Sequence, residues 1–91
     1  TIQKDRMSHY RRPHIKGATV FFTVGLRSQG SDLLLREISL LRSAVQRTLR
    51  ERPVTVNAWV VLPDHMHCIW TLPPDDDDFS TRWRIIKARF S

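Results

Sequence analysis

Two histidines that flank a single hydrophobic residue are the side chains of this sequence best suited to chemistry. His65 and His67 lie within the apolar stretch 60–70, and the residues around them predict a β-strand. Because successive side chains of a strand point to opposite faces, the two imidazoles emerge on the same side, close enough to share one cation. Imidazole is the commonest metal ligand in proteins. The pair therefore predicts a metal site, although a His-X-His triplet alone also fits two histidines that only cover a sheet face.

Two neighbours of the pair favour other interpretations. Asp64 is near enough to be a further ligand, but it also suits the second position of a tight turn, so we leave it out of the metal assignment. Cys68 alternates onto the strand face opposite the histidines. As the only cysteine it cannot form an internal disulfide. We predict that it is a buried free thiol that packs as a small hydrophobic residue.

The charge of the chain favours a nucleic-acid partner. Its 15 Lys and Arg residues outnumber nine acidic residues, which gives a formal net charge of +6, and twelve of the fifteen are arginine. The planar guanidinium group binds phosphate oxygens and stacks on bases, which lysine does less well. Nucleic acid is therefore favoured over an acidic protein partner. A basic surface that is merely solvated is the alternative.

Length and hydropathy indicate one small domain outside the membrane. A chain of 91 residues supports a single hydrophobic core, and 41% hydrophobic with 26% charged residues is typical of a globular protein. The longest apolar runs, such as 58–62, are far shorter than the roughly 20 residues of a membrane span. No signal peptide opens the chain. We therefore expect a cytoplasmic, nucleoid-associated protein.

The sequence divides into a basic arm and a folded domain. Residues 1–16 are polar and basic and predict a mobile N-terminal arm; if Met7 is the natural start, residues 1–6 have no part in the fold. The domain comprises residues 17–91. Its first strand is predicted at 18–26, where β-branched and aromatic residues lie between glycines.

Apolar residues spaced three and four apart predict two amphipathic helices. The first begins at Ser31 or Asp32, either of which can cap it, and ends before Pro53. The second spans about 79–90, after an acidic run at 75–78 that complements its positive end. The apolar stripe of the first comprises Leu34, Ile38, Leu41, Val45 and Leu49, with Arg36, Arg42, Arg47 and Arg50 off it. The second places Phe79, Trp83, Ile86 and Phe90 at the core, with Arg82, Lys87 and Arg89 outside.

Two further strands complete the pattern. Residues 54–62 and 65–72 flank a turn at Pro63 and Asp64, which predicts an antiparallel hairpin with the histidine pair near its tip. On the first of these strands, Val54, Val56, Ala58, Val60 and Leu62 are predicted to share one face, and Thr55, Asn57, Trp59 and Val61 the other. The order β-α-β-β-α predicts an α+β fold, a ferredoxin-like split βαβ unit with helices on one face of an antiparallel sheet and its last strand absent. We therefore expect the domain to be incomplete at its C-terminus.

Three segments of the chain, in this order, resemble the IS200-like single-tyrosine HUH transposases, and within them the REP-associated tyrosine transposases. They are residues 10–12 ahead of 19–24, the run 58–73 around the histidine pair, and residues 78–84. The resemblance covers nearly all of residues 7–91. A run of this length is far more specific than the triplet that it contains.

The resemblance implies a metal-dependent reaction on DNA. In the family, the His-hydrophobic-His pair holds Mg²⁺ or Mn²⁺, which polarises the scissile phosphate of single-stranded DNA, and His65 and His67 match those positions. Two imidazoles hold a hard cation weakly, so further oxygen or amide ligands and waters are expected. The family's nucleophile is a tyrosine on a helix further downstream, and it becomes linked to the 5′ end of the DNA. Tyr10 matches the Tyr-Arg-Arg segment instead, so we expect no catalytic tyrosine within these residues.

Other residues are expected to hold the DNA. The resemblance implies that Tyr10, Arg11 and Arg12 hold a hairpin or its flanking single-stranded tetranucleotide, through stacking and bidentate bonds to guanine edges. A solvated arm is the alternative. Phosphate contacts, or else a solvated helix face, are expected from Arg82, Arg84, Lys87 and Arg89.

Three functions stay open at this point. The leading one is an IS200-like transposase domain that binds single-stranded or hairpin (REP-type) DNA for metal-assisted cleavage and joining through a 5′-phosphotyrosine. The second is a catalytically dead fragment that binds the DNA hairpin without cutting it. The third is a ferredoxin-like RNA-binding module whose histidines are structural. The sequence leaves the oligomeric state open between monomer and dimer.

Overall fold

The computed structural model describes residues 6–7 and 15–91, and only the backbone of the first two. The predicted DNA contacts Tyr10, Arg11 and Arg12 lie outside the described residues.

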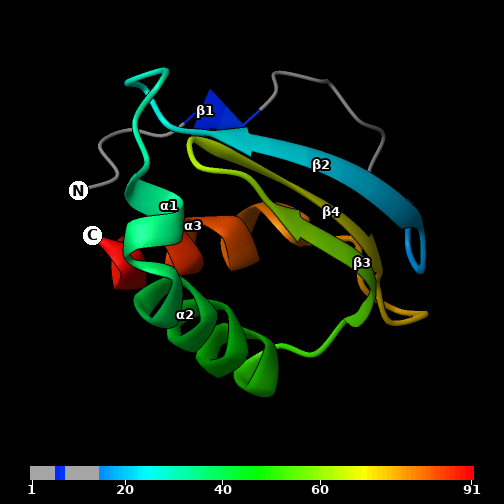
Figure 1. Cartoon of the computed structure of the whole chain (residues 1–91). Helices are drawn as coiled ribbons and strands as arrows, with labels where there is room; N and C mark the ends of the chain where they lie inside the picture. The colour runs from blue at the N-terminus through cyan, green and yellow to red at the C-terminus, as the bar shows by residue number, and fades with distance from the viewer. Residues whose placement is uncertain (1–5, 8–14) are drawn as a thin grey trace.

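An antiparallel sheet forms one layer of the molecule, with its strands in the order β1-β2-β4-β3 (Figure 1). The strands are β1 (Arg6–Met7), β2 (Thr19–Gly25), β3 (Thr55–Val61) and β4 (His65–Thr71). The central strand β4 pairs with β2 on one side and with β3 on the other. The predicted β3–β4 hairpin and the predicted α+β class are therefore confirmed, because the third long strand lies between the first two as in a split βαβ unit.

The short strand β1 lies along the free edge of β2. Arg6 is opposite Gly25 and Met7 is opposite Val24. The expectation that residues 1–6 have no part in the fold is therefore wrong for Arg6. The physical reason is that a sheet edge presents unpaired backbone groups, with which an extended segment can pair.

Helices α2 (Ile38–Glu51) and α3 (Phe79–Phe90) cover one face of the sheet, and α1 (Leu33–Arg36) precedes α2 (Figure 1). The second predicted helix is confirmed. The first is broken at Glu37, where φ is −109° and ψ is 36°, so the prediction of one continuous helix is wrong. The Leu34 N–H donates to the Pro63 carbonyl (3.1 Å), which ties α1 to the hairpin turn while α2 packs along α3. Among the described residues, no helix combines the length and the apolar composition of a membrane span.

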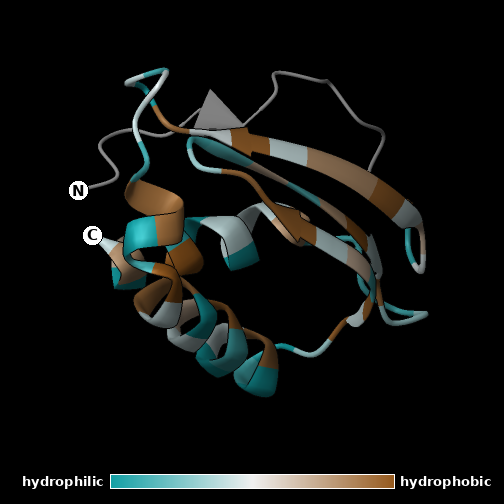
Figure 2. Ribbon diagram, in the orientation of Figure 1, coloured by the Kyte–Doolittle hydropathy of each residue, from teal (hydrophilic) through white to brown (hydrophobic). Residues whose placement is uncertain are grey.

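The hydrophobic core lies between the sheet and the helices (Figure 2). Trp70 of β4 and Trp83 of α3 stack with ring centroids 4.6 Å apart and planes inclined by 7°, and Phe22 packs edge-on against both. Such large aromatic contacts dominate the burial of a small domain. All four predicted core residues of α3 are buried: Phe79, Trp83, Ile86 and Phe90.

A bulge in β3 changes which of its side chains share a face. Val56 is opposite Trp70 on the helix side, but Ala58 is opposite Ile69 and Val60 is opposite His67 on the outer side. The extra residue, Asn57, reverses the alternation at this point. The prediction of one continuous face through Val54, Val56, Ala58, Val60 and Leu62 is therefore wrong.

Cys68 is buried on the inner side of β4, as predicted, with 3% of its surface exposed. Burial raises the pKa of its thiol to about 12. Because the thiolate is the reactive form, we expect an aromatic disulfide reagent near pH 8 to react roughly a thousandfold more slowly with the native chain than with the chain in denaturant. Absorbance of the released thiolate measures both rates. Rates within tenfold of each other would contradict the burial of Cys68.

Candidate metal centre

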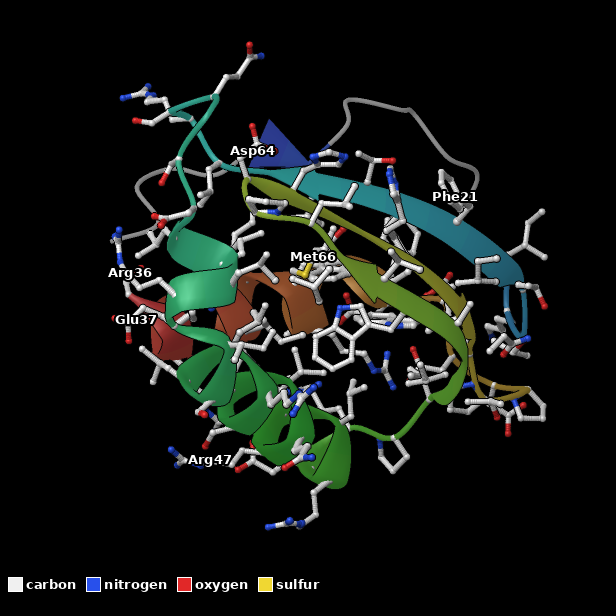
Figure 3. All side chains as sticks on the ribbon, in the orientation of Figure 1. Phe21, Arg36, Glu37, Arg47, Asp64 and Met66 are labelled. Carbon is white, nitrogen blue, oxygen red and sulfur yellow. The ribbon has the colours of Figure 1, made fainter. Side chains whose placement is uncertain are left out.

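His65 and His67 lie side by side on the outer face of β4, away from the helices. Their ring centroids are 5.0 Å apart and their planes are inclined by 82°. Between them Met66 points toward the helices and is buried (Figure 3). The predicted placement of the two imidazoles on one strand face is therefore confirmed. Their role as metal ligands stays a prediction.

Each imidazole has an oxygen partner at its Nδ1 atom. His65 Nδ1 is 2.8 Å from Asp64 Oδ1, and His67 Nδ1 is 3.1 Å from Thr23 Oγ1 on the neighbouring strand. Phe21 stacks on the ring of His67 with centroids 5.6 Å apart. A partner on one ring nitrogen fixes the ring and leaves the other nitrogen to a metal. The Nε2 atoms are therefore the donors that this arrangement offers.

Asp64 uses both of its carboxylate oxygens on neighbouring groups. Oδ1 contacts His65, and Oδ2 accepts a hydrogen bond of 2.8 Å from the Gly30 N–H. The Gly30 amide, followed by His65, lowers the pKa of Asp64 below its ordinary 3.8. Asp64 is therefore a carboxylate held by other groups, which agrees with leaving it out of the metal ligands.

The histidine pair supplies only part of the ligands that a metal ion needs. Within the described residues, no group of three or more His, Cys, Asp and Glu side chains is arranged to hold a metal. A cavity of about 300 Å³ adjoins His65 and is also lined by Gly25, Leu26, Gln29 and Asp64. Two imidazoles beside such a space fit a divalent cation that takes its other ligands from water or phosphate oxygens.

The outer face of the sheet extends from the histidine pair as an exposed surface without charge. The strands β2, β3 and β4 contain no Lys, Arg, Asp or Glu. Strand register aligns Phe21 with Ile69 and Ala58, and His67 with Val60 in the next row. Phe21 is 45% and Val60 53% exposed, and Phe21 points away from the helices (Figure 3). An exposed aromatic ring beside a candidate metal site suits the stacking of a planar ligand.

Arg82 is not on the surface, and the prediction that it lies outside is wrong. Its side chain is 3% exposed. The guanidinium donates to the carbonyls of Arg52, Pro53 and Asp78 and to both carboxylate oxygens of Asp76. Arg82 therefore ties α3 to the end of α2 and to the acidic loop. Its guanidinium makes five hydrogen bonds within the protein and is not available to a phosphate.

The other predicted cations of α3 differ in their surroundings. Arg84 is exposed, whereas Lys87 is half-buried. Arg89 donates to both carboxylate oxygens of Glu51, at 2.9 and 3.0 Å, and to Thr48. All of them lie in the helix layer, on the other side of the sheet from His65. The structure therefore does not bring them together with the histidine pair.

Comparison with known proteins finds relatives that match most of this chain. The chain is 60% identical over 85 residues to a REP-associated tyrosine transposase of Escherichia coli, and the match covers 93% of the chain. This chain is related to the REP-associated tyrosine transposases. A protein of Haemophilus influenzae assigned to the same group is 36% identical over 85 residues. The resemblance inferred from the sequence is thereby confirmed. No family model matches the chain.

A solved structure of a REP-associated tyrosine transposase shares the fold. It is described as bound to a REP hairpin, is 60% identical, and superposes with a TM-score of 0.86 over 91% of this chain. The chain spans about half the length of these transposases: 52% and 48% of the two relatives and 50% of the solved chain.

Sequence reasoning missed two residues of this chain that contact His67. One is Thr23, which lies directly opposite His67 across the β2–β4 pairing. The other is Phe21, whose ring covers one side of His67. The signal that could have found them is the period of two in β2, which puts both residues on one face once the pairing with β4 is known.

Proposed function

We propose that this chain is the DNA-holding, metal-binding part of a transposase. It would bind single-stranded or hairpin (REP-type) DNA for metal-assisted strand cleavage and joining through a 5′-phosphotyrosine. The observation that carries the proposal is the pair of oriented imidazoles of His65 and His67 on an exposed, uncharged sheet face. The identity with the REP-associated relatives supports DNA as the substrate, and a DNA partner would place the chain at the nucleoid.

The histidine pair would hold Mg²⁺ or Mn²⁺ through the two Nε2 atoms. When bound, such a cation supplies Lewis-acid polarisation of a phosphate oxygen. Asp64 and Thr23 would keep the two rings in place for this task. The attacking tyrosine is proposed to come from the part of the relatives' length that this chain does not span, because its one tyrosine, Tyr10, matches another segment.

Phe21 would hold an unpaired base of the DNA next to the phosphate at the metal. Its ring is exposed and stacks on His67, so a base stacked on its free side would lie beside the histidine pair. Further contacts are proposed for Tyr10, Arg11 and Arg12, and for Arg84 and Lys87 where the DNA reaches the helix layer. Arg82 is not proposed as a DNA contact, because it is buried.

The experiment compares Phe21→Ala with Val56→Ala, an apolar control of similar exposure (43% against 45%) on the helix side of the sheet. Fluorescence anisotropy measures the affinity for a REP hairpin with a single-stranded flank. Loss of one base–aromatic stack costs about 1–3 kcal/mol, so Phe21→Ala should weaken binding roughly 5- to 150-fold. Val56→Ala should stay within twofold of the wild type.

Two comparisons make the result decisive. A hairpin without the flank should bind both variants equally, because Phe21 is assigned to an unpaired base. An RNA of the same sequence should bind more weakly than the DNA. Equal affinity of Phe21→Ala and the wild type for the flanked hairpin would refute the proposed path of the DNA, and a preference for RNA would favour an RNA-binding module.

A further inference from the structure

We propose that Asp64 is a positioning residue that presents the His65 imidazole to the metal and fastens it to the loop at residues 26–30. This inference rests on the proposed function, since it assigns a role toward the cation that His65 would hold. Asp64 itself is not assigned as a ligand.

The first step is the hydrogen bond between the two side chains. A carboxylate can only accept, so its contact of 2.8 Å with His65 Nδ1 requires the proton of the neutral imidazole to be on Nδ1. The lone pair of that ring is then on Nε2, where a cation can bind it. Asp64 thus selects the tautomer of His65 that binds metal through Nε2 and holds the ring at one angle.

The second step is the attachment to the loop at both of its ends. The Gly30 N–H donates to Asp64 Oδ2 (2.8 Å), and the Leu26 N–H donates to the Asp64 carbonyl (2.8 Å). Gly30 has φ +84°, a left-handed conformation that favours glycine. The loop carries Gln29, which lines the cavity of about 300 Å³ beside His65. Asp64 therefore also sets the distance between this loop and the imidazole.

The third step is the contrast with the other histidine. His67 has a neutral partner, the Thr23 hydroxyl, and a hydroxyl can donate or accept, whereas a carboxylate can only accept. No other carboxylate in the described residues contacts either ring. The role of Asp64 is therefore not duplicated among the described residues, and its loss should weaken metal binding.

The test measures the Mn²⁺ affinity of the full 91-residue chain by electron paramagnetic resonance, for Asp64→Ala, Asp64→Asn and the control Asp32→Ala. The Asp32 side chain is exposed and, within the part of the chain that the structure describes, pairs with Arg36, so the control makes the same change of charge without touching the histidines. Loss of such a partner typically weakens metal binding about 10–100-fold, which we expect for Asp64→Ala. Asp64→Asn retains one acceptor oxygen and should recover part of this loss, and Asp32→Ala should stay within twofold.

A second readout separates orientation from simple loss of structure. Imidazole ¹⁵N resonances of the metal-free chain near pH 8 should show the Nδ1–H tautomer of His65 in the wild type and a mixture of tautomers in Asp64→Ala. An unchanged tautomer, or equal Mn²⁺ affinity of Asp64→Ala and Asp32→Ala, overturns the inference alone. If Asp64→Ala does not fold, Asp64→Asn decides by the same two measurements. A wild-type chain that binds no Mn²⁺ overturns the proposed metal site as well.

Discussion

Replacing Arg82 by leucine should destabilise the chain by about 3 kcal/mol, the lower end of the range found when one partner of a buried ion pair is removed, because the Asp76 carboxylate left behind is 31% exposed. The reason is that the guanidinium, 3% exposed, makes five hydrogen bonds whose acceptors would be left behind. Three of these acceptors are backbone carbonyls, those of Arg52, Pro53 and Asp78. Thermal unfolding followed by circular dichroism should show the melting temperature fall on the order of 12–24 °C, at about 4–8 °C per kcal/mol for a domain of this size.

Arg84→Leu is the matched control, because Arg84 lies on the same helix two residues away and is exposed. Its effect should stay within about 0.5 kcal/mol, as for most surface substitutions. Arg82→Lys keeps the charge but not the planar set of donors, so it should fall between the two. Equal stability of Arg82→Leu and Arg84→Leu would contradict the buried network.

The ion pair with Arg82 also predicts how acid acts on the chain. The Arg82 guanidinium, ahead of the Asp78 amide, lowers the pKa of Asp76 below its ordinary 3.8. A depressed pKa contributes stability that is present above the unfolded-state value and is lost as the pH falls through the folded-state value. The wild type should therefore lose stability below about pH 4, and Arg82→Leu should lose less over the same interval.

Replacing both His65 and His67 by alanine should abolish Mn²⁺ binding to the chain. Among the described residues the two histidines are His65 and His67, and their rings lie side by side on the outer face of the sheet. No third His, Cys, Asp or Glu of the described residues completes a group there. The stability should change little, because both rings lie at the surface of the sheet and not in the core. Electron paramagnetic resonance of free Mn²⁺ measures the binding, and circular dichroism checks the fold.

A double replacement of His9 and His14 by alanine provides the control, because it also removes two of the four histidines. It should leave Mn²⁺ affinity within twofold of the wild type. Retention of Mn²⁺ by the His65 and His67 double variant would show that the cation binds elsewhere. The hairpin-binding fragment that cannot cut would then be the better description of this chain.

Local patterns in the sequence determined several features that the fold confirms. The period of two put His65 and His67 on one face of β4 and Cys68 on the other, because alternation follows from the pleat and needs no distant contact. The spacing of apolar residues and the acidic run at 75–78 predicted α3 at its observed bounds. The structure adds that Asp78 of this run caps the helix by accepting from the Thr81 N–H. The long stretch of resemblance around the histidine pair predicted the relationship to the REP-associated tyrosine transposases.

Only the tertiary structure decided how these pieces meet. Thr23 reaches His67 across 44 residues of sequence, and Arg82 reaches the Arg52 carbonyl across 30. On a helix wheel Arg82 looks solvated, since nothing local shows that carbonyls at the end of α2 will surround it. The break at Glu37 and the bulge at Asn57 were also not predicted, because local preferences for a continuous helix or strand are small and tertiary contacts can outweigh them. Local periodicity sets which side a residue faces, whereas the partner on that side is set by packing between distant segments.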